Sequence, residues 1–517
     1  MSNNINNLFR NKNSLNRAGL IIKIIEFCSD SPISTRQISA ILNIDNKTVR
    51  YYLNKLKNFV EKKYNLGFVL TSKGRHLANK IGIRLNPKII QTLSKIKRSR
   101  YYHNIVHTEW KKIIKKHNKD LKDTNLFFHW YNLPDNFTLK VNIKKFRAFL
   151  NKLESKLNIK SDRQFALKLG YNEKLIWRYK KGMDHPSVRS VKKICNFAKM
   201  PYEDLEKYKI FKENFPIKIN KYILQLRTHL INEGNLNEDS SLYHNYDPVL
   251  LKNFQNCIKK IKRRVYHPRL TEKDIYILTD KFTSWLINFT DVNFGKTSKS
   301  NPRLHILQRN NFNFFKEHMA ITLAEEGILF LNLHKKHKNL YVDYHIGLGR
   351  AVDVSNLLPS FYKNKLNHGF LMFPKLPENI QHILCKQRCK LLDDEISILY
   401  KFLKLPCYRF IPKPLGIYKT KKGNISLYWS WNTQNREIVE RVYNMVIQNS
   451  WAHRKAMEYY KIWSRLFSKQ LSKQDIKEVD KIVYIYNRRG VPNFWIKEHM
   501  KKYFPSIEID KENFPIR

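Results

Sequence analysis

Two stretches far apart in the sequence end in the same way, and their pairing constrains the fold more than any other feature. LRTHLINEG runs from Leu226 to Gly234, and MAITLAEEG runs from Met319 to Gly327. Apolar residues recur at helical spacing in both stretches, so each predicts an amphipathic helix. We expect each helix to stop at its glycine, the residue that most easily adopts the left-handed turn after a helix.

The last turn of each predicted helix carries a glutamate, Glu233 in the first and Glu326 in the second. The helix dipole favours a cation at this end of a helix and disfavours an acid. An acid that occurs here twice indicates a compensating positive partner, and a metal ion would be one. Chance recurrence of Glu-Gly at helix ends is the alternative interpretation.

These stretches resemble the paired motif of the LAGLIDADG (dodecapeptide, DOD-type) homing endonucleases, and the resemblance extends from Phe215 to Leu466. Residues 294–307 are similar to the segment that often precedes the second motif in archaeal members. Residues 246–251 are similar to the start of the family's next helix. Thr228 and Ile321 depart from the family, which usually has small residues there, and argue against tight helix packing. Both acids are Glu where the family more often has Asp.

The resemblance implies an α+β fold. In the family, each repeat runs helix, two strands, helix, two strands and helix (αββαββα). Two repeats share a pseudo-twofold axis and form a saddle that sits on DNA. We expect the first repeat over residues 212–312 and the second over 313–470. Because one chain holds both repeats, we expect a monomer.

The resemblance also implies a site. Glu233 and Glu326 would lie side by side, each binding Mg²⁺ for one DNA strand through a carboxylate oxygen. Such ions help to generate the attacking water and to neutralise charge at phosphorus. Lys296 and Lys421 are the lysines that we expect to assist catalysis. The implied reaction is a metal-dependent double-strand cut at a long target site, leaving short 3′ overhangs.

Strand patterns are clearest in the second repeat. Over 424–432, Ile425, Leu427, Trp429 and Trp431 are expected to face inward, whereas Ser426, Tyr428, Ser430 and Asn432 face outward. A twisted sheet with one apolar face and one polar, basic face can lie against a duplex. The DNA-contacting residues expected here are Asn332, His334, Lys336, Lys419, Lys422 and Tyr428.

KLLDDEISIL, residues 390–399, competes as a degenerate catalytic helix because it carries Asp394 and Glu395. Ile396 stands where the helix-ending glycine should be, and the apolar pattern continues beyond it. We therefore interpret this stretch as the middle helix of the second repeat, with its acids in solvent.

Residues 14–95 are typical of a winged helix-turn-helix domain. A first helix should start near Ser34 or Thr35, and Asp45 or Asn46 should cap a second helix. Residues 68–74 are expected to form the wing. The second helix would lie in the major groove. Its expected DNA contacts are Lys47, Thr48, Arg50, Tyr51 and Lys55.

Residues 140–211 resemble the helix-turn-helix domains of phage repressors and follow a basic connector over 96–139. Residues 164–166 belong to its first helix, Gly170 to the turn, and residues 175–179 to the recognition helix. The expected DNA contacts are Asn172, Lys174 and Arg178. We interpret residues 471–517 as a basic C-terminal helical unit. Its hexapeptide KENFPI also occurs at residues 212–217.

The chain carries 97 Lys plus Arg against 43 Asp plus Glu, a net charge of +54 spread along its length. Self-repulsion of this size favours a polyanionic partner, and double-stranded DNA is the one we expect. Six scattered cysteines indicate reduced, buried thiols in a cytoplasmic protein. As a DNA-binding protein, it is expected to associate with the nucleoid. Cys385 and Cys389 are expected on one helix face. No apolar run is long enough for a membrane helix, so we expect no membrane contact.

The sequence favours a freestanding homing endonuclease. An intein is not expected, because the chain starts Met1-Ser2 and ends Ile516-Arg517. A transcription regulator that combines helix-turn-helix domains with a non-catalytic LAGLIDADG scaffold is the main alternative. An RNA-binding intron maturase is a third.

Overall fold

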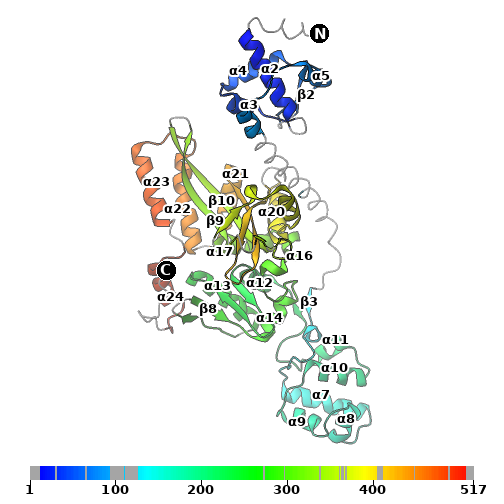
Figure 1. Cartoon of the computed structure of the whole chain (residues 1–517). Coiled ribbons are helices and arrows are strands. Elements are labelled where there is room, and N and C mark those ends of the chain that lie inside the picture. Colours follow the sequence, from blue (N-terminus) through cyan, green and yellow to red (C-terminus); the bar gives the residue numbers. More distant parts are fainter. Residues whose placement is uncertain are drawn as a thin grey trace. The chain divides into compact units, whose positions relative to one another are not determined.

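The structure is a computed structural model, and it divides into two compact units (Figure 1). One comprises Met1–Lys112 with Pro374–Lys386, and the other comprises Ile113–Phe373 with Gln387–Arg517. Helices and antiparallel sheets give a mixed fold compatible with the predicted α+β class. The residues that the structure describes are 12–28, 32–63, 67–93, 110, 126–262, 264–271, 274–295, 297–336, 339–359, 361–362, 366, 369–404, 411–447, 449–486 and 490–507.

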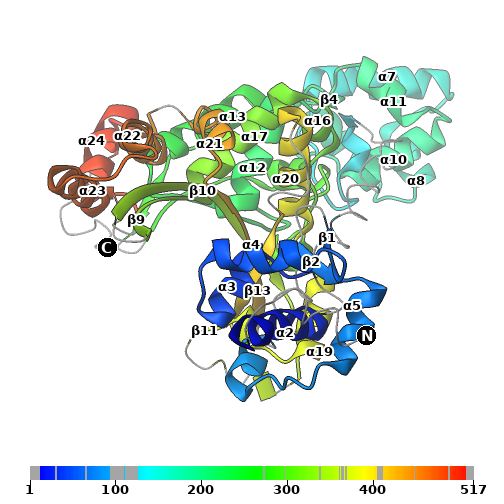
Figure 2. The same ribbon diagram turned by 90° about the horizontal axis from the view of Figure 1, so that it is seen from above.

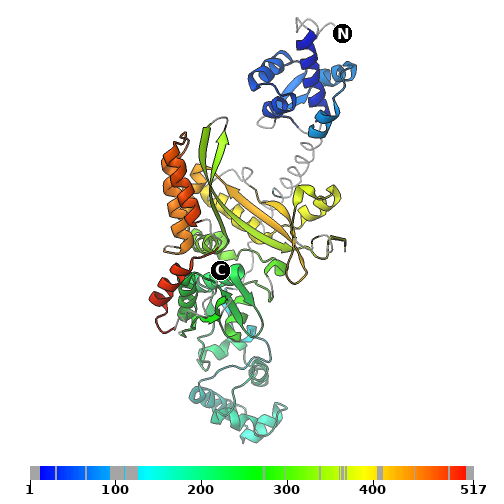
Figure 3. The same ribbon diagram turned by 60° about the vertical axis from the view of Figure 1, so that its left-hand side comes forward.

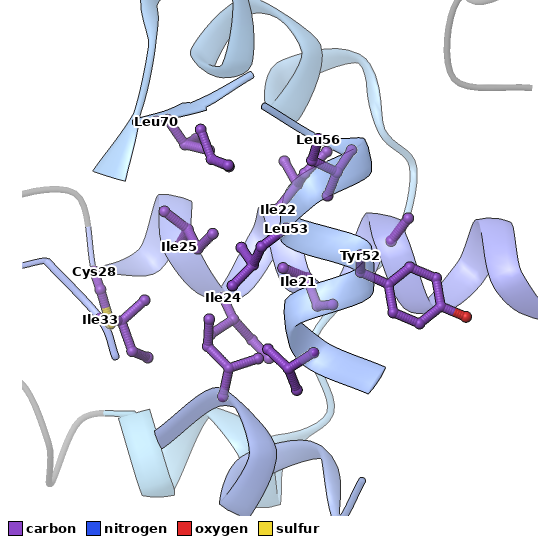
Figure 4. Close-up of a cluster of buried hydrophobic side chains, with 14 of the residues drawn as sticks. Ile21, Ile22, Ile24, Ile25, Cys28, Ile33, Tyr52, Leu53, Leu56 and Leu70 are labelled. Carbon is purple, nitrogen blue, oxygen red and sulfur yellow. The ribbon is translucent and has the colours of Figure 1, made fainter. Parts of the chain in front are cut away.

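The first unit places two short helices where the sequence predicts them. α2 (Lys12–Phe27) precedes α3 (Thr35–Leu42), which Ser34 caps, and α4 (Asn46–Lys55), which Asp45 caps. The Thr48 N–H donates to Asp45 Oδ1 at 2.8 Å. Apolar side chains of α2 and α4, such as Ile21, Ile25 and Leu53, fill the core of this unit together with Ile33 and Leu70 (Figure 4).

A hairpin follows α4 in the first unit. β1 (Val60–Lys63) pairs antiparallel with β2 (Gly67–Leu70). The expectation that residues 72–74 belong to the wing is wrong, because Ser72 begins α5 (Ser72–Lys80) after the Thr71 cap. Gly74 is buried there, and a Cβ on it would clash with the Phe59 carbonyl oxygen. Most of the predicted connector, 96–139, lies outside the described residues.

The second unit begins with small elements and five helices. The helices occupy the positions predicted for 140–211, and Gly170 and Gly182 have φ of 69° and 73°, as turns with left-handed backbone require. The elements are β3 (Phe127–Phe128), η1 (Trp130–Asn132), α7 (Ile143–Lys156), α8 (Asp162–Lys168), α9 (Leu175–Lys181), α10 (Val188–Phe197), α11 (Tyr202–Lys207) and β4 (Ile217–Lys218).

Two segments of the second unit then repeat one element order. The first runs α12 (Lys221–Glu233), β5 (Gly234–Leu236), β6 (Ser241–His244), α13 (Pro248–Lys262), β7 (Arg269–Thr271), β8 (Asp274–Leu278) and α14 (Lys281–Asn288). Its four strands are ordered β5-β6-β8-β7. α15 (Thr297–Ser300) and α16 (Ile306–Asn310) connect it to the second segment.

The second segment has the same order with longer strands and an insertion. It comprises α17 (Phe312–Glu325), β9 (Gly327–Lys336), β10 (Asn339–Asp353), β11 (Phe370–Met372), α20 (Lys390–Leu403), β12 (Lys413–Lys419), β13 (Ile425–Thr433) and α21 (Arg436–Tyr443). Between β11 and α20 the chain forms η2 (Phe373–Lys375) and α19 (Glu378–Lys386), of which Pro374–Lys386 belongs to the first unit. The strand order is β11-β12-β13-β10-β9, so without β11 both sheets share one topology.

Three helices complete the second unit. α22 (Trp451–Leu466) and α23 (Lys473–Tyr486) lie along the β9–β10 hairpin, and α24 (Asn493–Tyr503) lies against α13 (Figures 2 and 3). Asp247, at the start of α13, accepts from the Trp451 N–H at 2.7 Å and from Trp495 Nε1 at 3.4 Å. The second KENFPI phrase, residues 511–516, lies outside the described residues.

Three detailed expectations are wrong. The outward residues Ser426 and Ser430 of β13 are 2% and 3% exposed, so this strand is covered on both faces at these positions. Cys385 lies in α19, whereas Cys389 caps α20, so they do not share a helix. The acids of 390–399 are buried, although α20 is the middle helix predicted there.

Other expectations agree with the described residues. Five cysteines are free and buried, and Cys407 lies outside the described ranges. None of the helices in those ranges has the length and apolar character needed to cross a lipid bilayer.

Candidate functional site at the paired helix ends

Helices α12 and α17 lie side by side in the centre of the two repeats (Figure 2). Their apolar residues Leu226, Leu230, Met319 and Leu323 are buried, as the spacing predicts. Thr228 is also fully buried, and its hydroxyl lies 2.9 Å from His318 Nδ1 on α17. The interface therefore accommodates the unusual Thr228 through a hydrogen bond across the two helices.

The two glycines end the helices for a reason that differs from our expectation. Gly234 has φ of −113°, and Gly327 is absent from the residues with positive φ, so neither adopts the left-handed turn. A Cβ on Gly234 would lie 2.6 Å from Leu230 Cα, and one on Gly327 would clash with the Leu323 carbonyl oxygen. Glycine is needed because the chain turns directly from each helix into a strand.

The two glutamates line separate hollows. Glu233 is exposed and lines a hollow of about 260 Å³ with Ala324 and Glu325 from the other helix. Glu326 lines a hollow of about 180 Å³ with Ile231 and Asn232 from the first helix. Each hollow thus combines the glutamate of one helix with the last turn of its partner.

The strands add matching neighbours to each hollow. Asn245 and Tyr246, just after β6, line the Glu233 hollow, and Arg350 and Ala351 of β10 line the Glu326 hollow. Asn245 and Tyr246 directly follow the second strand of the first repeat, whereas Arg350 and Ala351 lie near the end of the second strand of the second repeat. The hollows are therefore related by the repeat of the fold, although their chemistry differs.

Glu326 has an unusual ionisation. Burial raises its pKa, Arg350 opposes the shift, and the nearby carboxylates of Glu325 and Glu395 support it, so that the pKa is about 7. The carboxyl group is therefore divided between its two forms near neutral pH.

Glu325, which the sequence did not indicate as a site residue, turns its carboxylate into the interface between α12 and α17. Its fully buried carboxylate accepts from Tyr243 OH and from Asn232 Nδ2 at 2.5 and 2.8 Å. His229 Nδ1 lies 2.5 Å from the same carboxylate. Two adjacent glutamates at a helix end gave no signal as to which one would turn into the interface.

A second buried carboxylate, Glu395, organises the repeat from α20. Arg350 donates to its two oxygens at 2.6 and 2.9 Å, and His318 Nε2 lies 2.8 Å away. Burial opposes ionisation, but Arg350 and His318 lower the pKa of Glu395. Asp394 likewise pairs with Arg303 at 3.2 Å. These contacts correct the expectation that the acids of 390–399 lie in solvent.

The expected catalytic lysines are placed differently. Lys296 lies outside the described residues, and Lys421 is exposed in the turn between β12 and β13. Lys455 of α22, which the sequence argument passed over, lines the Glu233 hollow. Burial lowers its pKa. It makes no ion pair with a carboxylate in the described ranges.

The expected DNA contacts of the two predicted helix-turn-helix segments are mostly exposed. On α4, Lys47, Arg50, Tyr51 and Lys55 are exposed, whereas the Thr48 hydroxyl donates to Asp45. In the 140–211 segment, Asn172 and Lys174 are exposed around the turn before α9, and Asn172 Oδ1 accepts from the Lys174 N–H at 3.0 Å. Arg178 is exposed and pairs with Asp184 at 2.7 Å.

The expected contacts of the second sheet are more varied. Asn332 and His334 are exposed on β9, and His334 pairs with Asp343 at 2.8 Å. The side chain of Lys336 lies outside the described residues. Lys422 is exposed and Lys419 half-buried. The half-buried Tyr428 covers Gly349, where a Cβ would clash with its hydroxyl.

Neither a family model nor a curated protein sequence matches the chain. Among solved structures, it is similar to the crystal structure of the LAGLIDADG homing endonuclease I-GzeII in complex with its DNA target. That comparison has 12% identity and a TM-score of 0.28, and it covers 51% of this chain and 97% of the other.

Proposed function

We propose that the chain is a DNA-binding, LAGLIDADG-type homing endonuclease that makes metal-dependent double-strand cuts at a long target site. The observation that carries the proposal is the pair of repeat-related hollows. Glu326 is the carboxylate of one hollow, and Glu233 lines the other together with Glu325 and Asp247, so each glutamate lies beside the last turn of the opposite helix. Two such half-sites suit two phosphodiester bonds, one on each strand.

The donors in the hollows fit Mg²⁺ only together with DNA. Within the described ranges, no cluster of three or more His, Cys, Asp or Glu side chains could hold a metal ion. Mg²⁺ commonly takes one or two carboxylates and completes its shell with water and substrate phosphates. Glu233 and Glu326 would each supply one such ligand. When bound, the ion would neutralise charge at the scissile phosphate.

The remaining residues of each hollow would orient the phosphate and water. Lys455 brings a cationic amine without an ion-paired carboxylate to the Glu233 hollow, where it can contact a phosphate oxygen. Arg350 occupies the corresponding hollow but is already held by Glu395. We therefore propose unequal contributions of these cations to the two half-sites.

Glutamine substitutions test the proposal. Glu233→Gln and Glu326→Gln keep the shape of each side chain and remove the charge that would bind the metal. Each change should abolish cutting of its own strand and leave nicked product on a plasmid carrying the target. Binding of the duplex in EDTA should persist or tighten, because a carboxylate repels phosphates. Lys461→Met, on an exposed face of α22, is the control.

A transcription regulator is the second candidate, favoured by the exposed basic residues of α4. For a regulator, both glutamine variants should bind DNA as the wild type does, and Mg²⁺ should change neither binding nor strand integrity. Preference for a structured RNA over any duplex would instead favour a maturase. Unchanged double-strand cutting by both variants would contradict the assignment of the two glutamates.

The net charge of +54 leads to a second test. If about six or more phosphates are contacted, affinity for a duplex should fall by about a thousandfold between 50 and 200 mM salt. Fluorescence anisotropy over this range measures the slope. A flat response would contradict a phosphate-dominated interface. A cytoplasmic location beside the nucleoid is part of the same proposal.

A further inference from the structure

The residues just before the two glutamates meet across the helix pair. Asn232 precedes Glu233 on α12, and Glu325 precedes Glu326 on α17. Asn232 Nδ2 donates to Glu325 Oε2 at 2.8 Å. This hydrogen bond joins the last turn of one helix to the last turn of the other, immediately beside both hollows.

Both partners of this hydrogen bond are held in place from behind. Glu325 Oε1, the other carboxylate oxygen, accepts from Tyr243 OH at 2.5 Å. Asn232 Oδ1 accepts from Arg350 Nη2 at 3.0 Å, and Arg350 is itself anchored by Glu395. Because arginine can only donate and an ionised carboxylate can only accept, the orientation of the Asn232 amide is determined.

We propose that Asn232 and Glu325 form a clamp that fixes the spacing between Glu233 and Glu326. The proposal rests on the proposed function, because this spacing matters only if both carboxylates act on one duplex. Each clamp residue is joined by a peptide bond to the glutamate that follows it, Asn232 to Glu233 and Glu325 to Glu326. A shift of the clamp therefore moves the backbone that carries that glutamate. Asn232 and Glu325 are positioning residues and need not touch DNA.

Other polar contacts also join the two helices, among them His229 with Glu325, and one of them lies away from the helix ends. The Thr228 hydroxyl lies 2.9 Å from His318 Nδ1 and also joins α12 to α17. Thr228 is more than one helical turn from Glu233, and neither it nor His318 lines a hollow. Thr228→Val therefore removes a buried hydrogen bond from the same interface without touching the helix ends, and it is the matched control.

Breaking and reversing the clamp tests the proposal. Asn232→Asp places a carboxylate against that of Glu325 and should separate the two last turns. A displacement of about 1 Å can reduce a reaction rate by about a hundredfold, so the second cut should slow by about tenfold to a hundredfold and nicked plasmid should accumulate. The double variant Asn232→Asp with Glu325→Gln restores the hydrogen bond with reversed polarity. It also keeps an oxygen for Tyr243 and His229, and it should regain paired cutting.

Hydrogen exchange of backbone amides tests the clamp independently of DNA cleavage. Backbone amides of residues 230–236 and 323–329 should exchange faster together in Asn232→Asp and return to wild-type rates in the double variant. Thr228→Val should leave both the nicked-to-linear ratio and these amides unchanged. Failure of the double variant to restore protection, or equal nicking by Thr228→Val, would overturn the clamp. A wild type that neither binds nor cuts DNA would overturn the proposed function, and the exchange result would still decide the clamp.

Discussion

The Glu233 and Glu326 hollows are built from equivalent elements but hold their carboxylates in opposite ways. Glu233 is exposed, and the cation beside it, Lys455, comes from a helix outside both repeats. Glu326 is held at the edge of a buried charge network, with Arg350 already paired to Glu395. One topology can therefore carry two electrostatic designs, because the sheets set the positions and the surrounding helices set the charges.

The largest change in stability is expected at the Arg350–Glu395 ion pair, which is buried in the second repeat. Glu395→Gln leaves the Arg350 guanidinium in the core without its charged partner, which should lower the free energy of unfolding by about 3–5 kcal/mol. Urea denaturation measures the loss. The double variant Arg350→Met with Glu395→Leu should recover most of it, since an apolar pair needs no desolvation of charge. A loss below about 1 kcal/mol for the single variant would contradict a structural role for this pair.

The ionisation of Glu326 should give the next largest effect. Its raised pKa means that the folded protein binds this proton more tightly than the unfolded chain does. The corresponding stability is fully present below the ordinary pKa of 4.5 and is lost as the pH rises through about 7. Between pH 5 and pH 8, the wild type should therefore lose up to about 3 kcal/mol relative to Glu326→Gln. Parallel stability curves for the two proteins would show that Glu326 ionises normally.

Substitution of the glycines at the two helix ends should have a smaller effect on stability. Alanine at either position forces a Cβ against the preceding helical turn, which costs about 1–3 kcal/mol. Gly327→Ala should be the more destabilising, because its Cβ meets the Leu323 carbonyl oxygen more closely than a Cβ on Gly234 meets Leu230. Thermal unfolding of the two variants compares them directly. A larger loss for Gly234→Ala would reverse the ranking.

The smallest effect is expected where the two repeats are alike. His244 pairs with Asp274 in the first sheet, and His334 pairs with Asp343 in the second, all partly exposed. Asp274→Asn and Asp343→Asn should each change stability by less than about 1 kcal/mol. Chemical denaturation at low and high salt measures both. A larger change in only one repeat would show that the two repeats also differ electrostatically on the exposed surface of their sheets.

Local patterns predicted much of the fold. Spacing of apolar residues located α12 and α17, and the predicted caps Ser34 and Asp45 lie at helix starts where their side-chain oxygens accept backbone N–H groups. Alternation over residues 424–432 located β13. Such features depend on residues a few positions apart, so a single sequence contains them.

The site was predictable only in part, because its chemistry depends on contacts between distant segments. The sequence identified Glu233 and Glu326 but not the burial of Glu325, whose partners include Tyr243. It placed Glu395 in solvent, since the arginine that pairs with it lies 45 positions away. Lys455 was not predicted as a site residue, because the sequence around it does not indicate that α22 lies next to the Glu233 hollow.

The carboxylate of Asp247 also has a consequence for how the chain is made. Its partners Trp451 and Trp495 follow it by 204 and 248 positions. At about 5–20 residues per second, the ribosome needs roughly ten to fifty seconds to deliver both. During that interval the carboxylate must stay hydrated, so this edge of the first repeat remains open while the second repeat is synthesised. This edge of the first repeat can close fully only after Trp495 has been synthesised.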